Sequence, residues 1–426
     1  MKKLCVAIFL GGSSREREIS FFGGRTVFDN IDKSRYDPVL IFIDEFRNFI
    51  KLKWQYIYKG SIQDFYSFSK EMNNEKIFKE LIEEKVNSIG EKIFPENFKD
   101  HFDFAFLTLH GSFGENGSIQ GLLDWYNIPY SGSKILGSAI GLDKVFHKNF
   151  LKNEGFDSIP SLYIKRENWL SNKSKILSNS FFLKNNELVV KSSTQGSSIG
   201  VYKTDNSCIK KIEAAIDKAF FVKKVEKNFW QKLSIEEKKI FCLNLKDFEN
   251  EIGYPISIMD FKISFPEELI VFLNNYFEKN NDVLIEGLPK EKNVVIEKFI
   301  SGREFTCIVL KEKNKKPVAL PPTEIIKEGD LFSFDQKYLP GSIKKKTPID
   351  ISLETIKKLC STCVKVFEKL NFSTYARIDG IILNEKIFIN DPNTTVGMLP
   401  SAFIFQQAAM VGINPKQLIT FIIENS

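Results

Sequence analysis

Strand and helix signals alternate through the first 130 residues of the chain. Apolar strands are predicted at residues 3–10, 38–43 and 102–109, and helices at residues 18–30, 77–86 and 117–126. This alternation indicates βαβ units around a parallel sheet that is covered on both faces. Ligands of such sheets bind at the carboxyl ends of the strands, and glycine-rich turns follow the first and third strands here. We therefore expect a Rossmann-like parallel α/β domain over residues 1–132.

The rest of the chain suggests two further domains, which suits 426 residues at about 150 residues per domain. Residues 133–302 are expected to form a central α+β domain, with a helix at 138–153 and a strand at 187–191. A long segment near 205–290, rich in Lys, Phe, Asn and Glu, is expected to be a mostly helical insertion. Residues 303–426 are expected to form a C-terminal α+β domain with an antiparallel sheet. Its predicted strands are 304–310, 375–383 and 386–390, and its last helix is 415–424.

Charge and hydropathy exclude several classes of protein. Sixty Lys and Arg against 54 Asp and Glu give a net charge of only +6, whereas nucleic-acid-binding proteins concentrate positive charge. No run reaches the ~20 apolar residues of a membrane span. Residues 1–10 resemble a short signal peptide but lack a cleavage pattern, so a buried first strand is favoured. We expect a cytoplasmic protein that binds neither nucleic acid nor membrane.

The six cysteines are scattered, and one pair has CxxC spacing. Cys360 and Cys363 lie within a helical pattern at 353–370. No second pair and no nearby His completes a zinc site. These thiols are therefore interpreted as core or helix-face residues of a reducing compartment rather than as redox or metal ligands.

Two glycine-rich loops could contact a ligand. The first, GGSSREREIS at residues 11–20, is either a capped helix N-terminus or an anion site in which Glu16 could bind an ammonium group. The second, HGSFGENGSIQG at residues 110–121, surrounds one His and one Glu with turn-forming residues. Such a loop allows close approach of the backbone to a ligand, although a lone His is often structural.

A third loop, at residues 189–201, allows two interpretations. Residues 196–200 match G-x-S-x-G, the nucleophile elbow of serine hydrolases. An elbow needs a helix directly after it, whereas Val201–Lys203 is predicted to be a strand, and every His precedes Ser198. The alternative is a Gly/Ser loop between antiparallel strands that folds over phosphates, with Lys191 directed at them.

The fourth pattern is a pair of strands that carry carboxylates near the C-terminus. Period-2 alternation places Arg377 and Asp379 on one face, and Asp391 and Asn393 on one face. Clustered oxygen ligands that also meet phosphates are typical of a magnesium site. The alternative is a polar sheet face with ion pairs. Arg is scarce in this chain, which favours the functional interpretation.

Taken together, these motifs resemble those of the D-alanine–D-alanine ligases of the ATP-grasp superfamily. The resemblance covers the whole chain except most of residues 205–290. The motifs that carry it are GGSSREREIS, HGSFGENGSIQG, GLDK at residues 141–144, VVIEKFISGREFT at 294–306, FDQKY at 334–338, ARIDG at 376–380 and NDPNTTVG at 390–397. The resemblance implies an ATP-grasp fold with the three domains described above.

The resemblance also implies how ATP and metal would be bound. Lys144 and Lys191 would contact the phosphates, Glu297 the adenine amino group and Glu304 the ribose hydroxyls. Ser198 and Lys298 belong to the same nucleotide site. The two Mg²⁺ ions, for which Mn²⁺ can substitute, would be bound by Asp379, Asp391 and Asn393.

The implied reaction joins two D-alanines through an acyl phosphate, for peptidoglycan synthesis and hence cell-wall biogenesis and cell shape. Glu16 would bind the ammonium group of the first substrate, and Arg377 and Gly397 would stabilise the oxyanion. Ser197, Glu16 and Tyr338 would close a mobile loop that excludes water. The remaining substrate residues are His110, Lys337 and Ser401. The family commonly dimerises, so a homodimer is expected.

The chain departs from the family pattern at several points, among them Val396, where the family usually has Pro, and Thr194-Gln195, which replaces a more charged pair. Asp391 stands where the family has Glu, and residues 398–403 differ from the segment that binds the second substrate. Two alternatives follow. The chain is an ATP-grasp ligase that uses another second substrate, or it is a catalytically weak paralogue that binds ATP.

Overall fold

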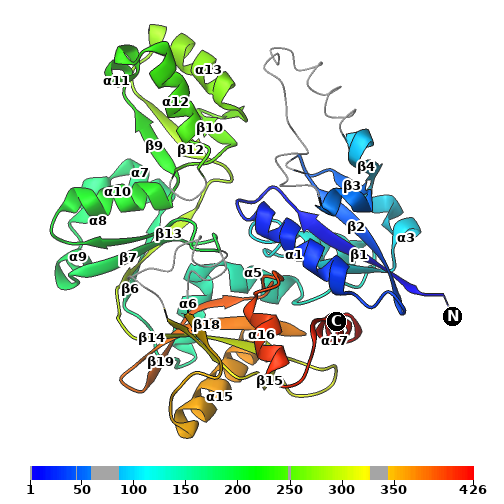
Figure 1. The fold of residues 1–426 in the computed structure, drawn as a ribbon. Coiled ribbons are helices and arrows are strands. Elements are labelled where there is room, and N and C mark those ends of the chain that lie inside the picture. Colours follow the sequence, from blue (N-terminus) through cyan, green and yellow to red (C-terminus); the bar gives the residue numbers. More distant parts are fainter. Residues whose placement is uncertain (1, 45, 59–85, 248–250, 327–343) are drawn as a thin grey trace. The chain divides into compact units, whose positions relative to one another are not determined.

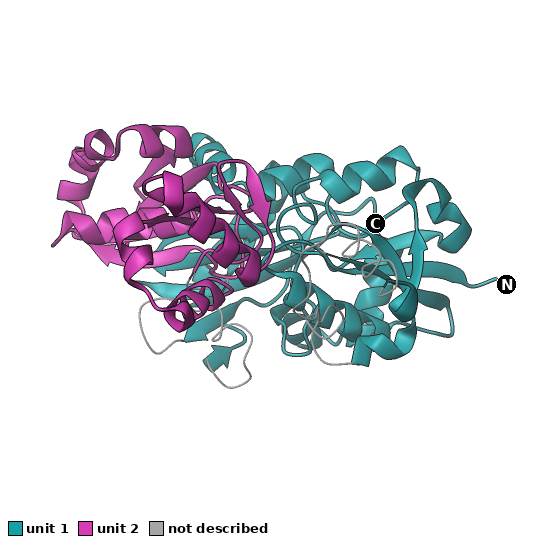
Figure 2. Ribbon diagram, turned by 90° about the horizontal axis from the view of Figure 1, so that it is seen from above, with its two compact units in different colours: residues 1–157, 302–326, 343–426 teal, residues 158–301, 327–342 magenta. Residues whose placement is uncertain are grey.

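The computed structural model describes residues 2–44, 46–58, 86–247, 251–326 and 344–426. They form two compact units (Figure 2). Of the described residues, unit 1 comprises those within 2–157, 302–326 and 344–426, and unit 2 comprises those within 158–301. The division into three domains at residues 132 and 302 stays a prediction.

The N-terminal sheet of unit 1 has five strands in the order β4-β3-β2-β1-β5 (Figure 1). The strands are β1 (Leu4–Gly11), β2 (Tyr36–Ile43), β3 (Phe49–Leu52), β4 (Gly90–Ile93) and β5 (Phe104–Leu107). Its helices are α1 (Arg17–Asn30), α3 (Phe98–His101) and α4 (Ser118–Trp125). Strand β1 pairs in parallel with β2 and β5, as predicted, whereas β3 and β4 add an antiparallel edge. The predicted helix at 77–86 lies almost wholly outside the described residues.

Both faces of this sheet are covered. Ile8 packs with Phe21 of α1 on one face, and Phe9 packs with Leu123 of α4 on the other. Because both of its faces are buried, β1 has a continuous run of apolar residues, as is usual for buried parallel strands.

The second sheet of unit 1 is antiparallel, with the order β17-β16-β14-β18-β19 and β15 paired to β14. Its strands are β14 (Arg303–Leu310), β15 (Val318–Ala319), β16 (Thr323–Ile326), β17 (Lys344–Lys346), β18 (Tyr375–Leu383) and β19 (Lys386–Asn393). The helices around it are α5 (Ile135–Leu142), α6 (Lys144–Asn153), α15 (Leu353–Lys369), α16 (Phe403–Ala409) and α17 (Pro415–Glu424).

The single helix predicted at residues 138–153 is wrong, because α5 and α6 are separate. The carboxylate of Asp143 accepts hydrogen bonds from the amides of Val145 and Phe146, at 2.9 and 3.1 Å. An Asp in this position caps the start of a helix and so begins α6 anew.

Unit 2 is built on two four-stranded sheets, β6-β13-β7-β8 and β11-β10-β12-β9. The first contains β6 (Ser161–Lys165), β7 (Glu187–Ser192), β8 (Val201–Asp205) and β13 (Asn293–Lys298), and the second contains β9 (Val222–Val225), β10 (Ile256–Ile258), β11 (Phe261–Ile263) and β12 (Val283–Gly287). The helices are α7 (Arg166–Ser171), α8 (Lys173–Leu177), α9 (Ser180–Lys184), α10 (Ile209–Ala219), α11 (Lys227–Lys232), α12 (Ile235–Asn244) and α13 (Pro266–Lys279).

The mostly helical character expected for residues 205–290 is therefore only half right. The described residues of this segment, 205–247 and 251–290, contain four helices, but they also form the whole β11-β10-β12-β9 sheet. These strands are three to five residues long. Runs that short show too few alternations to be distinguished from loops by pattern.

Two other predictions about local structure are confirmed. All six cysteines are free thiols, and Cys360 and Cys363 lie in α15. The strand β8 follows the G-x-S-x-G segment directly and pairs antiparallel with β7, so the helix that a nucleophile elbow needs is absent at this point.

Candidate active site

Four polar side chains meet on one face of strands β18 and β19. Asp379 lies opposite Asp391, and Arg377 lies opposite Asn393. Arg377 forms a bidentate salt bridge with Asp379, in which Nε lies 3.0 Å from Oδ1 and Nη2 lies 2.8 Å from Oδ2. The Thr306 hydroxyl donates to Asp379 at 2.6 Å. Like charges directly opposite each other destabilise a sheet unless cations separate them.

A β-bulge in β19 brings the two pairs to the same face. The register shifts so that Gly380 pairs with Ile389 while Asp379 pairs with Asp391, so β19 has one extra residue, Asn390, at this point. Ile389 belongs to the core beneath α15. Strict alternation would turn Asp391 toward that core as well, and the bulge turns it to the opposite face instead.

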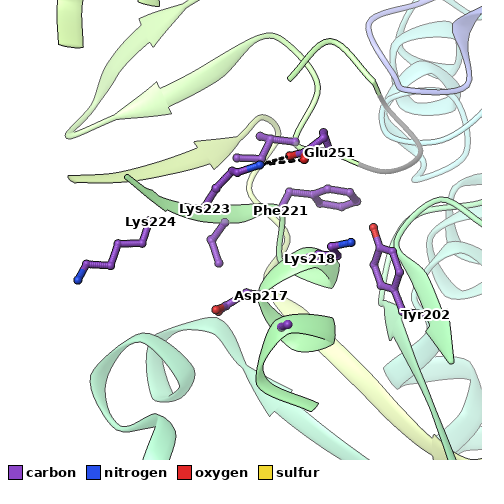
Figure 3. Close-up of a pocket in the computed structure, with 10 residues that line it drawn as sticks. Tyr202, Asp217, Lys218, Phe221, Lys223, Lys224 and Glu251 are labelled. Atoms are coloured by element: carbon purple, nitrogen blue, oxygen red, sulfur yellow. Dashed lines mark hydrogen bonds and ion pairs between the residues drawn. The ribbon is translucent and has the colours of Figure 1, made fainter. Parts of the chain in front are cut away.

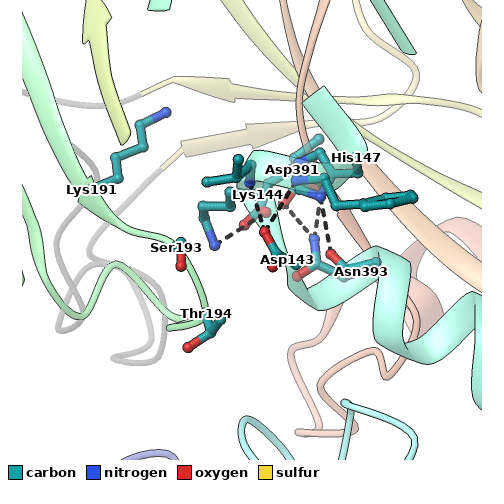
Figure 4. A network of polar contacts seen from close by, with 12 residues as sticks. Asp143, Lys144, His147, Lys191, Ser193, Thr194, Asp391 and Asn393 are labelled. Carbon is teal, nitrogen blue, oxygen red and sulfur yellow. Dashed lines mark hydrogen bonds and ion pairs between the residues drawn. The ribbon is translucent and has the colours of Figure 1, made fainter. Parts of the chain in front are cut away.

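Lys144 adds a cation to this group. It is the first residue of α6 and is buried, with 5% of its surface exposed. Its Nζ lies 3.5 Å from Oδ1 of Asp391 (Figure 4). In the part of the chain that the structure describes, no cluster of three or more His, Cys, Asp or Glu could hold a metal. A metal here would therefore need the amide oxygen of Asn393 beside the two carboxylates.

The two glycine-rich loops of the N-terminal sheet contact each other. Gly111 has φ +69°, and a Cβ built on it would lie 3.2 Å from Oε2 of Glu16. Glu16 is buried after the Gly11–Gly12 turn. A glycine at position 111 is thus required by both the backbone conformation and the space.

His110 lies in the same buried cluster. Its Nδ1 is 3.9 Å from Oε2 of Glu115, and no hydrogen-bond partner of its Nε2 occurs among the described residues. Burial, together with the nearby Arg377, lowers the pKa of His110 to about 4. The imidazole is therefore neutral at pH 7.

Glu115 connects the second glycine-rich loop to the segment after β19. Its carboxyl accepts hydrogen bonds from the Gly111 amide at 2.7 Å and from the Thr395 amide at 3.3 Å. Burial, and then the charge of Glu16, raise the pKa of Glu115 to about 8. The acid is thus predominantly neutral at pH 7, which avoids a second buried charge beside Glu16.

The segment that carries Gly397 is packed from two sides. A Cβ on Gly141 of α5 would lie 2.9 Å from Thr394, and one on Gly23 of α1 would lie 3.5 Å from Met398. A Cβ on Gly397 itself would meet nothing within 4 Å. Space is therefore left at the position where the sequence predicts an oxyanion donor.

Unit 2 contains the other predicted cation. Lys191 on β7 pairs with Val295 on β13, and Glu297 lies two residues further along β13, so the two side chains are on the same face of the sheet. Its Nζ is 2.5 Å from Oε2 of Glu297, and both residues are buried. The other face of this sheet packs on α10 through Val190 and Ile296. The polar pair is thus presented on the face away from the helix.

The Gly/Ser loop after Lys191 has an unusual backbone. Ser197 and Ser198 have φ +53° and +65°, and Gly200 has φ +69°. Successive amides in such turns can point into one concave site and bind anions. This conformation supports the phosphate-loop interpretation of the segment.

The other predicted residues lie in several places. Lys298 is exposed at the end of β13, and Glu304 is half-buried on β14. The carbonyl oxygen of Ser401 accepts hydrogen bonds from Lys345 and Gln406. Lys337 and Tyr338 lie outside the described residues.

Two buried acids were not predicted as site residues. Glu115 was visible in its motif, but its partner Thr395 is 280 residues away. Glu291 binds the Gly/Ser loop from a segment without any motif. Only its position three residues before the motif at residues 294–306 could have drawn attention to it.

A surface pocket of about 230 Å³ lies elsewhere in unit 2 (Figure 3). It is lined by α10, β9 and neighbouring residues, including Lys218, Phe221 and Lys223. Lys223 is paired with Glu251 at 2.7 Å. None of the predicted site residues lines this pocket.

Comparisons with known proteins point in one direction. Residues 5–133 match the family model "D-ala D-ala ligase N-terminus", and residues 255–424 match "D-ala D-ala ligase C-terminus". A D-alanine–D-alanine ligase of Azobacteroides pseudotrichonymphae is 30% identical over 421 residues, which cover 99% of each chain.

Two solved structures share the fold. The VanG D-Ala:D-Ser ligase of Enterococcus faecalis has a TM-score of 0.64 at 19% identity, with 99% of each chain covered. The D-alanine–D-alanine ligase of Bacillus anthracis, complexed with ATP, has a TM-score of 0.55 at 22% identity, with 99% of this chain and 97% of that chain covered. These likenesses confirm the expected ATP-grasp fold. Among the described residues, no helix is long and apolar enough to cross a membrane.

Proposed function

The chain belongs to the D-alanine–D-alanine ligase family, and we propose that it joins two D-alanines at the expense of ATP. The products are ADP, phosphate and D-alanyl-D-alanine for peptidoglycan synthesis. An acyl phosphate forms first on one D-alanine, and the amine of the other then displaces the phosphate. A relative with the same fold is known complexed with ATP, which supports the choice of phosphoryl donor.

Separate segments of the chain supply the residues that are assigned to ATP in this proposal. Lys191 and the loop that carries Ser198 contact the phosphates, since left-handed residues such as Ser197 and Ser198 can direct successive amides to one anion. Lys144 contributes a second buried cation. Glu297 and Lys298 are assigned to the adenine end, and Glu304 to the ribose.

Asp379, Asp391 and Asn393 would hold Mg²⁺. The opposed carboxylates and the amide offer the hard oxygen ligands that Mg²⁺ or Mn²⁺ prefers. When bound, the metal neutralises charge on the phosphates during transfer. Arg377 and Lys144 keep the two carboxylates together before it binds.

The first D-alanine is placed by the N-terminal loops. Glu16 binds the ammonium group of this substrate. Neutral His110 lies in the same buried cluster as Glu16, and its Nε2 is available for a hydrogen bond. Arg377 and the amide of Gly397 stabilise the oxyanion, a role worth about 3–4 kcal/mol per donor in similar sites. Glu115 fixes the distance between the His110 loop and the Gly397 segment.

The second D-alanine is assigned to the remaining predicted residues. Lys337 and Ser401 bind its carboxylate, and Tyr338 closes the site together with Ser197 and Glu16. Exclusion of water is needed because an acyl phosphate hydrolyses readily.

The observation that carries the proposal is the meeting of Arg377, Asp379, Asp391 and Lys144 on one side of the C-terminal sheet. The test is a phosphate-release assay with ATP, Mg²⁺ and a panel of D-amino acids. Release that requires D-alanine, with D-alanyl-D-alanine as product, supports the proposal. Release with D-alanine only when a different second amino acid or hydroxy acid is present identifies a ligase of another specificity. Nucleotide binding without release identifies a catalytically weak paralogue.

A further inference from the structure

Glu291 is a buried acid that contacts three successive residues of the Gly/Ser loop. It lies between β12 and β13, and only 2% of its surface is exposed. Its Oε1 accepts hydrogen bonds from the Ser193 hydroxyl at 2.7 Å and from the Thr194 amide at 2.8 Å. Its Oε2 accepts from the Thr194 hydroxyl at 3.0 Å and from Gln195 Nε2 at 3.1 Å.

These contacts are of the kind that fixes a backbone. A carboxylate accepts hydrogen bonds more strongly than a neutral group, especially when it is buried. The main chain adds to them, because the Ser193 amide donates to the carbonyl of Asn293 at 3.2 Å. Residues 291–293 therefore form hydrogen bonds with three consecutive residues, 193–195, at the start of the loop.

The far end of the loop is fixed by packing instead. A Cβ on Gly200 would lie 2.1 Å from the Ser192 hydroxyl oxygen and 3.0 Å from the Phe221 ring. The Ser192 hydroxyl in turn donates to the carbonyl of Ala219 at 2.5 Å. With both ends fixed, the turn around Ser197 and Ser198 has little freedom to change its direction.

We propose that Glu291 is a positioning residue for the triphosphate, which it acts on through the loop at residues 193–198. This inference rests on the proposed use of ATP, but not on the identity of the amino-acid substrates. Glu291 itself has no contact with the nucleotide in this role. Both carboxylate oxygens of Glu291 accept hydrogen bonds from the loop, in five contacts with donors of Ser193, Thr194 and Gln195. The carboxylate therefore holds the loop in place and does not itself contact the phosphates.

The test compares two changes that break the same contact from opposite sides. Glu291→Gln keeps the size of the side chain but replaces one acceptor oxygen by a donor. Thr194→Val keeps the shape of Thr194 and removes its hydroxyl. Binding of the non-hydrolysable analogue AMP-PNP with Mg²⁺ is measured by calorimetry, and the Michaelis constants for ATP and D-alanine are measured by phosphate release.

The matched control is Glu286→Gln. Glu286 is a partly buried acid of the same unit, but it pairs with Arg166 and Lys290 and makes no hydrogen bond or ion pair with the loop among the described residues. The control shows what the loss of a buried acid does to unit 2 in general.

We expect Glu291→Gln to weaken AMP-PNP binding at least about tenfold, since hydrogen bonds to a charged group are lost. Thr194→Val has a smaller effect in the same direction, and the double variant is no weaker than Glu291→Gln alone. The Michaelis constant for D-alanine and the binding by Glu286→Gln stay within about twofold of wild type.

The inference is overturned if folded Glu291→Gln binds AMP-PNP as wild type does, or if Glu286→Gln weakens binding equally. It is also overturned if the wild-type chain does not bind AMP-PNP. Should Glu291→Gln fail to fold, Thr194→Val decides alone, and binding of AMP-PNP by folded Thr194→Val that equals binding by wild type then overturns the inference. Binding of AMP-PNP by a wild-type chain that releases no phosphate with D-alanine would refute the proposed function and leave this inference intact.

Discussion

Asp379 and Asp391 face each other across the β18–β19 pair, and both side chains point away from the core beneath α15. Two carboxylates in this relationship repel each other in the absence of a cation. The forked contact of Arg377 and the 3.5 Å approach of Lys144 supply cations of the protein itself. We infer that a bound divalent metal would further reduce the repulsion between the two carboxylates.

Asp391→Asn is therefore expected to weaken metal binding. Removing one of the two proposed carboxylate ligands should raise the dissociation constant for Mn²⁺ at least about tenfold. Electron paramagnetic resonance of Mn²⁺ in the presence of AMP-PNP measures it. Asp391→Glu, which restores the residue normal in the family, should keep or raise activity. Asp282→Asn, which changes an exposed acid paired with Lys224, serves as control. Unchanged Mn²⁺ binding by Asp391→Asn would remove Asp391 from the metal site.

Arg377→Lys is expected to lower kcat about 100-fold, because Lys keeps the charge but cannot form the fork with Asp379 and also donate to an oxyanion. The Michaelis constant for ATP should change little. Steady-state kinetics with saturating D-alanine separate the two quantities. Equal loss in kcat and in ATP affinity would indicate that Arg377 binds nucleotide instead.

Much of the polar face could be predicted from sequence, because it depends on short-range order. Period-2 alternation alone places Arg377 with Asp379 and Asp391 with Asn393. The bulge at Asn390, which unites the pairs, does not follow from the alternation; Asn390 and Pro392 are residue types that occur at such irregularities, but they do not fix where the register shifts.

Contacts between distant segments could not be predicted from the sequence, for a different reason. Glu115 meets Thr395, and Glu291 meets Thr194, across 280 and 97 residues. Periodicity reports which face a residue occupies, but not which distant segment covers that face. The short strands of the β11-β10-β12-β9 sheet were missed because three residues carry too little pattern.

Lys191 and Glu297 form a buried ion pair, in which each charge compensates the cost of burying the other. Lys191→Met leaves the Glu297 carboxylate buried without its cation and is expected to destabilise unit 2 by about 3–5 kcal/mol. The double variant Lys191→Met with Glu297→Met should recover most of this loss while AMP-PNP binding stays weak. Thermal unfolding and calorimetry measure the two effects. A double variant as unstable as Lys191→Met would show that the pair is not coupled.

Glu115 should make stability depend on pH. Its pKa is raised from the ordinary value of 4.5 to about 8 by burial and by Glu16, with opposing contributions from the amides of Gly111 and Thr395 and from Arg377. Between these two pH values the folded chain keeps a proton that the unfolded chain has lost. The unfolded state thus binds fewer protons, and the free energy of unfolding falls as pH rises from about 4.5 to 8.

Glu115→Gln removes this titration but keeps a neutral side chain of similar size. We expect its unfolding temperature to fall less steeply than that of wild type between pH 5 and pH 8. The neighbouring His110, whose pKa is lowered to about 4, gives a slope of the opposite sign below pH 6.5. That slope is present in both proteins and cancels in their difference. Scanning calorimetry at pH 5, 6.5 and 8 measures the difference, and parallel profiles would mean that Glu115 is already ionised in the folded chain at pH 5.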